Sequence, residues 1–410
     1  MLQDPRDLYT GILGIGLPWR VTEVELRKEA GELHVMVSYA AESGYRCPEC
    51  GRRGSRKDGR LRRWRHLDTC QYKTIVTCDV PRVSCAEHGV HQVPVAWAEQ
   101  RTHFTALFEV SVIDWLKETS IVAVARRMDL SWEEVDGVMT RAVRRGLARR
   151  KRERVAHLGV DETSFQKRHE YVTVVVDRTR GRVLYVGDDR KKKTLEAFYK
   201  GLEPKELAAI ETVAMDMWDP YIQATLKHVP NAGKKICFDK FHVAKHLGEA
   251  VDQVRRQEHR TLLKQGDETL KGTRYLWLQN PENMSEERWQ DLEELRRSSL
   301  KSARAWQLKE VAMGLWGYLR PGWAIKAWRW WIGWAQRCRL EPMRRRARMV
   351  KEHLWGIINA IVKRVTNAAG ESMNAKIQRV KRMACGYRNR ARFRNAIYFH
   401  CGDLDLYPAE

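Results

Sequence analysis

Four apolar segments decide the fold of this chain: VAHLGVD at residues 155–161, YVTVVVDRTRGRVLYVGD at 171–188, TVAMDM at 212–217 and KICFDKFH at 235–242. The second segment predicts a hairpin over a Thr-Arg-Gly turn, and the other three predict strands with helices between them. A strand hairpin followed by strands interleaved with helices is typical of a mixed α/β sheet with helices on its faces.

Two of these segments lead into an aspartate. Asp161 closes the first apolar run, and Asp216 closes the run in ETVAMDMWDPY. Because open α/β sheets place their ligand sites at the carboxyl ends of strands, we expect the two carboxylates to face one site. An aspartate at a strand end can equally be a turn residue or a helix cap, so the prediction depends on a third acid.

That third acid, Glu371, opens the basic segment ESMNAKIQRVKRMACGYRNRARFRNAIYF, which predicts a helix. Four apolar side chains share one helical face and are expected to pack on the sheet: Met373, Ile377, Val380 and Ala384. Glu371 projects to the opposite side, near Asn374, Gln378 and Arg382. Three converging carboxylates would suit a pair of Mg²⁺ ions, which can stabilise both oxygens of a phosphoryl displacement. The alternative is an acid placed at a helix N-terminus by the helix dipole.

Composition and periodicity divide the 410 residues into five segments. We predict a zinc-binding domain at 1–100, a helix-turn-helix at 101–150, the first part of a catalytic core at 151–245, an all-helical insertion at 246–365, and a core helix carrying Glu371 at 366–410. The first segment is strand-like and rich in turns, whereas the insertion is rich in Arg, Glu and Trp and shows no strand pattern.

Two short motifs within the first segment predict a metal site. Cys47-Pro-Glu-Cys50 and Cys85-Ala-Glu-His88 each place two ligands at the same spacing, and together they supply three thiolates and one imidazole for tetrahedral zinc. With all four positions filled by protein, the site would be structural. The fourth ligand is the least secure, because His91, Cys70, Cys78 or His66 could replace His88. The alternative is two unrelated cysteine turns.

A helix pair is predicted by SIVAVARRM followed by DLSWEEVDGVMTRAVRRG. Ser131 and Glu134 form a capping box for the second helix. Apolar Val135, Val138, Met139 and Ala142 recur at helical spacing and leave a polar face for DNA. We expect four arginines to contact phosphate: Arg141, Arg144, Arg145 and Arg149. A helical hairpin that only packs is the alternative, since the turn lacks glycine.

Charge points to a polyanionic partner. Lys and Arg exceed Asp and Glu by 75 − 52 = 23, so nucleic acid or an anionic membrane is expected. No apolar run reaches the ~18 residues of a membrane-spanning helix, and the N-terminus lacks a signal-peptide pattern. Nine cysteines, an odd number, argue against a secreted disulfide framework. We therefore expect a cytoplasmic protein that acts on nucleic acid.

Further basic residues follow the Trp-rich part of the insertion. Arg344 and Arg345 are expected to contact flanking phosphate, as are Lys376, Arg379 and Arg382 on the predicted C-terminal helix. The tryptophans of the insertion are Trp316, Trp323, Trp328, Trp330, Trp331 and Trp334. They are expected mainly in a core, although one of them could stack on a flipped base.

GVDETSF, AMDMWDPY, FDKFHVAKHL and AAGESMNAKIQRVKRMACGYRNRARFRNAIYFH resemble the DDE transposases of bacterial insertion sequences of the ISL-three type. The resemblance covers most of the chain, including the paired cysteines and the helix pair. It implies an RNase H-like core with Asp161, Asp216 and Glu371 as catalytic acids. The 371 − 216 = 155 residues between the last two acids imply a helical insertion. Asp239-Lys-Phe-His242 resembles an Asp-x-x-His element, in which His242 would position the scissile phosphate or the leaving group.

This resemblance implies a nucleoid-associated enzyme that acts on double-stranded DNA. Such an enzyme binds terminal inverted repeats, cuts them with Mg²⁺ or Mn²⁺, and joins the freed 3′-OH ends to target DNA. Pairing two ends calls for at least a homodimer. One alternative is a sequence-specific DNA-binding regulator with a catalytically silent core. Another is an RNase H-like nuclease that acts on RNA or branched DNA without strand transfer.

Overall fold

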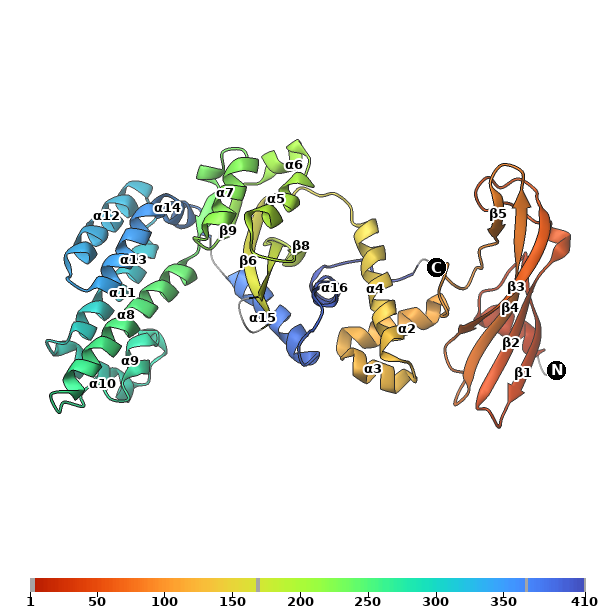
Figure 1. Cartoon of the computed structure of the whole chain (residues 1–410), viewed down its shortest axis with the longest axis horizontal. Helices are drawn as coiled ribbons and strands as arrows, with labels where there is room; N and C mark the ends of the chain where they lie inside the picture. Colours follow the sequence, from red (N-terminus) through yellow and green to blue (C-terminus); the bar gives the residue numbers. More distant parts are fainter. Residues whose placement is uncertain (1–3, 167–169, 366–367, 409–410) are drawn as a thin grey trace. The chain divides into compact units, whose positions relative to one another are not determined.

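The protein is described by a computed structural model covering residues 4–166, 170–365 and 368–408 (Figure 1). It forms two compact units, the first comprising Met1–Arg150 and Leu404–Glu410 and the second Lys151–Asp403. The sequence-based division puts residues 404–410 with the catalytic core. The described part of this segment, 404–408, lies in the first unit instead, because Arg149 donates to the carboxylate of Asp405 at 3.1 Å and to the carbonyl of Tyr407 at 2.6 Å.

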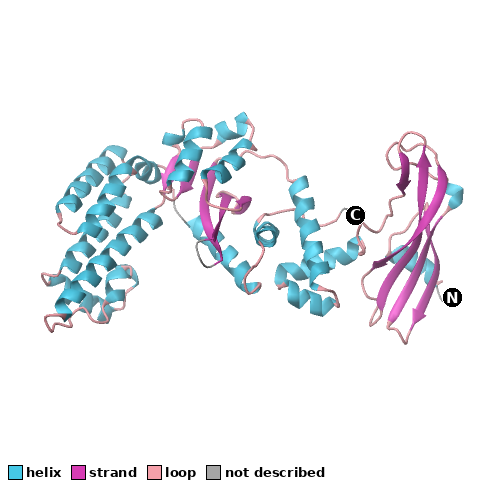
Figure 2. Cartoon of the chain, in the orientation of Figure 1, coloured by secondary structure: helices cyan, strands magenta, loops and turns pink. Residues whose placement is uncertain are grey.

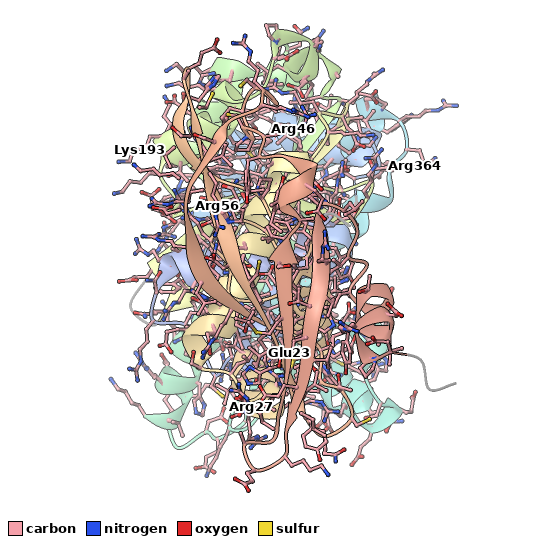
Figure 3. All side chains as sticks on the ribbon, turned by 90° about the vertical axis from the view of Figure 1, so that its right-hand side faces the viewer. Glu23, Arg27, Arg46, Arg56, Lys193 and Arg364 are labelled. Carbon is pink, nitrogen blue, oxygen red and sulfur yellow. The ribbon has the colours of Figure 1, made fainter. Side chains whose placement is uncertain are left out.

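The first unit begins with helix α1 (Pro5–Ile12), which the sequence did not predict, and a five-stranded sheet. Its strands are β1 (Trp19–Arg27), β2 (Glu32–Tyr39), β3 (Ser55–Arg65), β4 (Lys73–Cys85) and β5 (Gly89–Gln92). They lie in the order β1-β2-β4-β3, and β5 pairs with β4. One face buries Trp19, Trp64 and Trp97 edge to face, whereas exposed charged side chains such as Glu23, Arg27 and Arg56 point outward (Figure 3).

Three helices complete this unit: α2 (Ala106–Glu118), α3 (Ile121–Met128) and α4 (Trp132–Arg149). The predicted capping box of α4 is present, because Ser131 and Glu134 bond each other's backbone reciprocally. The turn before α4 has no glycine. Asp129 adopts the left-handed conformation there, with φ of 52°, and short polar residues tolerate that conformation better than most.

The second unit contains the predicted mixed sheet, with strand order β10-β9-β6-β7-β8. Its strands are β6 (His157–Gln166), β7 (Glu170–Asp177), β8 (Arg182–Gly187), β9 (Thr212–Met215) and β10 (Ile236–Phe238). β6, β7 and β8 run antiparallel, and β9 and β10 run parallel to β6. The predicted β7–β8 hairpin turns at Gly181, whose φ of 65° suits glycine.

The helices of the described residues that accompany this sheet outside the insertion are α5 (Lys192–Lys200), α6 (Pro204–Ala209), α7 (Asp219–His228), α15 (Ala368–Met383) and α16 (Arg390–Cys401). α15 lies against β6, and α16 packs against β8 and α15 (Figure 1). Met373, Ile377 and Val380 are buried as their spacing predicts, and Ala384 is half-buried. The apolar stripe therefore fixes which side of α15 faces the rest of the unit.

The segment between β10 and α15 is helical, as expected (Figure 2). It comprises α8 (Lys240–Leu263), α9 (Arg274–Leu278), α10 (Glu286–Arg297), α11 (Lys301–Gly314), α12 (Pro321–Arg337), α13 (Glu341–Glu352) and α14 (Leu354–Val362). α8 packs against both α11 and α13. It starts at Lys240, so the predicted boundary at 245/246 falls inside this helix. No helix among the described residues is long and apolar enough to cross a membrane.

The tryptophans of the insertion divide between core and surface. Trp328 and Trp331 are fully buried, and the indole of Trp331 donates to the carbonyl of Leu308 at 2.8 Å. Trp316 and Trp334 are partly buried against the same core. Trp323 and Trp330 are more than half exposed, so the expectation of a mainly core role holds for four of the six.

Candidate active site and metal-binding cluster

Strand register places two of the predicted acids side by side. β6 and β9 pair in parallel, and their last paired residues are Val160 and Met215. Asp161 and Asp216 are the next residues on the two strands, so they occupy matching positions about 4.8 Å apart in the pairing direction. The expectation that Asp161 ends its strand was wrong, because β6 continues to Gln166. Beyond Val160, however, β6 pairs only with β7.

α15 brings the third acid to the same place. Asn374, one turn after Glu371, donates from its side-chain amide to the carboxylate of Asp161 at 2.6 Å. Further along α15, Gln378 donates to the hydroxyl of Thr163 at 3.0 Å, and Lys381 donates to the carbonyl of Ser164 at 2.8 Å. These three contacts run in register along β6. They place the first turn of α15, and with it Glu371, beside the end of the β6–β9 pairing.

A cavity of about 480 Å³ collects the predicted catalytic residues. Asp161, Asp216, His242 and Glu371 all line it. The Nδ1 atom of His242 lies 3.7 Å from a carboxylate oxygen of Asp216. Asp239, the first residue of the Asp-x-x-His element, is not among the residues that line the cavity. It is buried and caps α8 by accepting from the amide of Phe241 at 2.9 Å. The structure thus gathers the four predicted side chains from β6, the end of β9, the first turn of α8 and the distant helix α15.

The donor set of this cavity fits hard divalent cations, because its three predicted ligands are carboxylates. Two of them are held in place by backbone: Asp161 accepts from the amide of Glu162 at 2.7 Å, and Asp216 accepts from the amide of Met217 at 2.6 Å. Among the residues described, only the cysteine–histidine cluster has its ligand atoms within 4.8 Å of one another. The three acids share one cavity at a wider spacing.

The cavity wall also holds the guanidinium of Arg190, which no sequence motif had indicated. Arg190 lies between two aromatic rings, 4.6 Å from the centroid of Tyr171 and 4.8 Å from that of Trp218. It donates to the carboxylate of Glu162 at 3.3 Å, and the indole of Trp218 donates to the Arg190 carbonyl at 3.2 Å. Burial raises the pKa of Glu162, and Arg190 opposes that rise. A cation held this firmly beside three acids is suited to receive phosphate.

The predicted zinc ligands come together at one end of the first unit's sheet. Cys47 and Cys50 lie in a turn closed by the amide of Gly51 donating to the carbonyl of Cys47 at 2.8 Å. Cys85 ends β4, and His88 lies in the turn before β5. All four ligand atoms are within 4.8 Å of one another. The sulfurs of Cys50 and Cys85 are 3.8 Å apart, about the edge of a tetrahedron with Zn–S bonds of ~2.3 Å.

The structure favours His88 over the other candidates for the fourth zinc ligand. Cys78 is buried in β4, where burial raises the pKa of its thiol to about 12. His66 is buried against the Thr105 hydroxyl, and burial lowers its pKa to about 4. Cys70 is exposed, and neither it nor His91 belongs to the cluster. His88 therefore fits the fourth position best.

Three of the four helix-turn-helix arginines are engaged inside the first unit. Arg145 is buried and donates to Glu109 at 3.3 Å and to Glu99 at 2.9 Å. Arg141 donates to the same Glu109 at 2.8 Å, and Arg149 holds the C-terminal residues as described above. Burial raises the pKa of Glu109, and the two arginines oppose that rise. The prediction of a DNA contact is therefore wrong for the buried Arg145, whose donors serve the fold. It stays a prediction for Arg141, Arg144 and Arg149, of which Arg144 and Arg149 are exposed.

The other predicted DNA contacts lie on helix surfaces of the second unit. Lys376, Arg379 and Arg382 are exposed on α15. Arg344 and Arg345 are exposed on α13, where Arg344 also pairs with Glu341 at 3.1 Å. Their side chains are available to a polyanion.

A zinc-type cluster, a helix-turn-helix and an α/β core with three acids in one cavity define the class of DDE transposases, and sequence comparison agrees. A family model described as a transposase of the ISL3 type matches residues 158–397. A second family model, described as "zinc-finger of transposase IS204/IS1001/IS1096/IS1165", matches residues 44–88. "Helix-turn-helix domain of transposase family ISL3" matches residues 93–143. The chain belongs to the ISL3 family of transposases, which confirms the resemblance found in the sequence.

Curated relatives cover almost the whole chain. The transposase for insertion sequence element IS1557 of Mycobacterium tuberculosis is 30% identical over an alignment 420 residues long, which covers 93% of this chain and 92% of that protein. The transposase for insertion sequence element IS1001 of Bordetella parapertussis is 29% identical over 352 residues, or 85% of this chain and 86% of that protein. The similarity therefore extends through all the segments described above.

Proposed function

We propose that this transposase binds the terminal inverted repeats of its insertion sequence, cuts DNA strands at their ends, and joins the freed 3′-OH ends to target DNA. The observation that carries the proposal is the single cavity shared by Asp161, Asp216 and Glu371, which come from β6, the end of β9 and α15. The sheet of the second unit, in which three antiparallel strands are followed in the chain by two parallel ones, supports an RNase H-like core.

The three carboxylates would hold Mg²⁺ or Mn²⁺. Such ions, when bound, activate water and stabilise the leaving oxygen of an in-line displacement at phosphorus. Asn374 keeps one oxygen of Asp161 oriented through its 2.6 Å hydrogen bond. Arg190, braced by Tyr171 and Trp218, contacts the phosphate. His242 lies on the Asp216 side of the cavity and positions the leaving group. This scheme requires no covalent protein–DNA intermediate.

The first unit supplies recognition of DNA ends in this proposal. α4 follows a capped turn and presents exposed Arg144 and other polar side chains, as the recognition helix of a helix-turn-helix does. The cysteine–histidine cluster binds zinc as a structural ion and fixes two turns of the neighbouring sheet. Pairing of two ends requires at least a dimer, and the protein acts in the cytoplasm on nucleoid DNA.

Zinc removal gives a direct prediction for this unit. Cys47→Ser should lose the one zinc per chain and lower the melting temperature of the first unit, because zinc binding contributes to folding. Elemental analysis and thermal unfolding measure both effects. Cys70→Ser is the matched control: its thiol is exposed and outside the cluster, so zinc and melting temperature should stay as in wild type. Zinc retained at full occupancy in Cys47→Ser would exclude this ligand set.

The proposed function is tested with a labelled duplex that carries an end of the insertion sequence, incubated with Mg²⁺, with Mn²⁺ or with EDTA, in the presence of a plasmid target. We expect metal-dependent strand cuts and products joined to the plasmid. Binding without cuts would instead favour the regulator. Cuts without joined products would favour a nuclease.

A further inference from the structure

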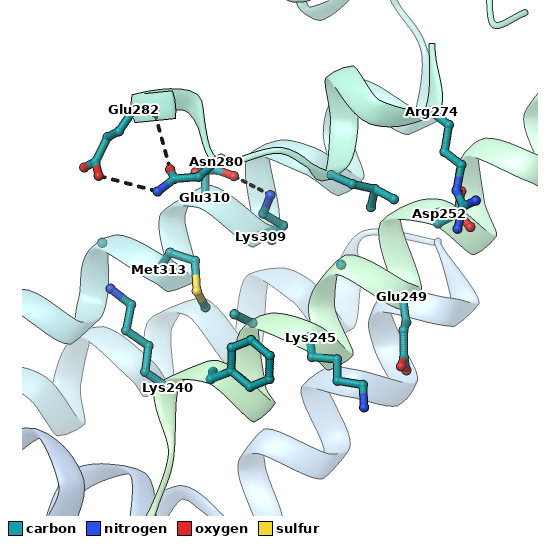
Figure 4. Close-up of a pocket in the computed structure, with 15 residues that line it drawn as sticks. Lys240, Lys245, Glu249, Asp252, Arg274, Asn280, Glu282, Lys309, Glu310 and Met313 are labelled. Atoms are coloured by element: carbon teal, nitrogen blue, oxygen red, sulfur yellow. Dashed lines mark hydrogen bonds and ion pairs between the residues drawn. The ribbon is translucent and has the colours of Figure 1, made fainter. Parts of the chain in front are cut away.

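A groove of about 810 Å³ lies between α8, α9 and α11 of the helical insertion (Figure 4). Phe241 and Lys245 line this groove, and the same two residues line the candidate active-site cavity. The two spaces therefore meet across the first two turns of α8. The groove has the volume of a small-ligand pocket. It is large enough for one or two nucleotides and too small for a duplex.

At the end of the groove nearest the candidate active-site cavity, the lining side chains that lack an ion-pair partner are positively charged. Lys240 and Lys245 are exposed there, and within the described residues no carboxylate lies at ion-pair distance from either. Three of the four acids further along the groove are engaged by cations: Glu249 pairs with Arg346 at 2.9 Å, and Glu310 pairs with Lys309 at 2.7 Å. Asp252 pairs with Arg255 at 3.0 Å and Arg274 at 3.6 Å. The fourth, Glu282, lies beyond α9, away from Lys240 and Lys245, and accepts from the side-chain amide of Asn280 at 3.5 Å. A phosphate would therefore be attracted to Lys240 and Lys245, at the start of α8.

The apolar surface of the groove suits a base. Phe241 is 49% exposed, which is unusual for a phenylalanine, and it lies in the same turn as Lys240. Ala244 and Gly248 follow at one-turn intervals, with Leu278 and Met313 on the facing helices. Small side chains on α8 leave the groove open. A Cβ at Gly248 would meet only Leu278, at 4.0 Å, so a longer side chain there would extend into the open space.

We propose that this groove binds unpaired nucleotides of the DNA strand next to the cut, with a base stacked on Phe241 and its phosphates on Lys240 and Lys245. The inference rests on the proposed function, since it assumes that the phosphate at which the DNA strand is cut lies in the acid-lined cavity. Stacking on an aromatic ring accepts any base and combines with basic residues in single-strand binding. The groove thus favours DNA whose end is already opened.

The test compares the affinity for two fluorescent duplexes, one blunt and one with a four-nucleotide single-stranded extension, by anisotropy in Ca²⁺ to prevent cutting. Wild type should prefer the extension by about tenfold, which is within the range of one stacked base. Phe241→Ala and Gly248→Met should each reduce the preference to about twofold or less, the first by removing the ring and the second by filling the groove.

Two variants serve as matched controls. Tyr275→Ala removes an aromatic ring that is 64% exposed on α9 and does not line the groove. Gly322→Met adds the same side chain at an exposed position of α12, where a Cβ meets nothing within 4 Å. Both should keep the tenfold preference. The proposal is overturned if wild type shows no preference or if Phe241→Ala and Gly248→Met retain it. Because the assay needs no cleavage, a protein that binds the extension through the groove yet cuts nothing would refute the proposed function alone.

Discussion

Glu371→Gln is expected to lower the rate of metal-dependent strand cleavage by about 10³-fold, or ~4 kcal/mol of transition-state stabilisation. The amide has nearly the shape of the carboxylate but lacks the charge that holds divalent cations. Single-turnover cleavage of a labelled insertion-sequence end measures the effect. The affinity for the same DNA should change by no more than about twofold, because the helix-turn-helix lies in the other unit.

The control for this prediction is Glu352→Gln. Glu352 is an exposed glutamate at the end of α13, in the same unit as Glu371, and it does not line the acid cavity. Its replacement removes one negative charge without touching the proposed site, so cleavage should remain close to the wild-type rate. Equal rates in Glu371→Gln and Glu352→Gln would remove Glu371 from the chemistry.

Arg145→Ala is expected to destabilise the first unit by about 3–5 kcal/mol, because it leaves the buried carboxylate of Glu109 with one of its two arginine partners missing. Glu109 and Arg145 have side chains only 2% and 8% exposed, so solvent cannot compensate. Urea unfolding followed by tryptophan fluorescence measures the loss, since Trp19, Trp64 and Trp97 form the core of this unit's sheet.

Arg144→Ala is the neighbouring control, because it removes the same charge from an exposed position of the same helix. Its effect on stability should stay within about 0.5 kcal/mol, whereas its affinity for duplex DNA should fall and the salt dependence should weaken. If Arg145→Ala were as mild as Arg144→Ala, the buried ion pair would not be a stabilising feature of the unit.

Local sequence patterns predicted those features that are formed by residues close together in the chain. The β7–β8 hairpin, the capping box at Ser131 and the buried stripe of α15 were all predicted. The end of β6 was not. Val160 is its last residue paired with β9, so beyond it the strand is paired on one side only. Its sequence changes there from apolar to DETSFQ, which resembles a turn although pairing with β7 continues.

Contacts between distant segments could not be predicted. Arg145 looked solvent-exposed because its buried partner, Glu109, is 36 residues away on α2. The stacking of Arg190 between Tyr171 and Trp218 joins β7, the segment after β8 and the segment after β9. No spacing rule links such positions. The three acids were an exception, because the strand-end positions of Asp161 and Asp216 and the lone acid of a basic helix favoured one site, and the resemblance to a known family then joined Glu371 to the two aspartates.

The central claim is that these three acids, from β6, the end of β9 and α15, form one metal site. Titration with Mn²⁺ followed by electron paramagnetic resonance, on protein whose cysteine–histidine cluster is already filled with zinc, tests it most directly. We expect the tightest Mn²⁺ site to be lost in Asp161→Asn and in Glu371→Gln alike, and to be kept in Glu352→Gln. Tight Mn²⁺ binding that survives Glu371→Gln would contradict a shared site.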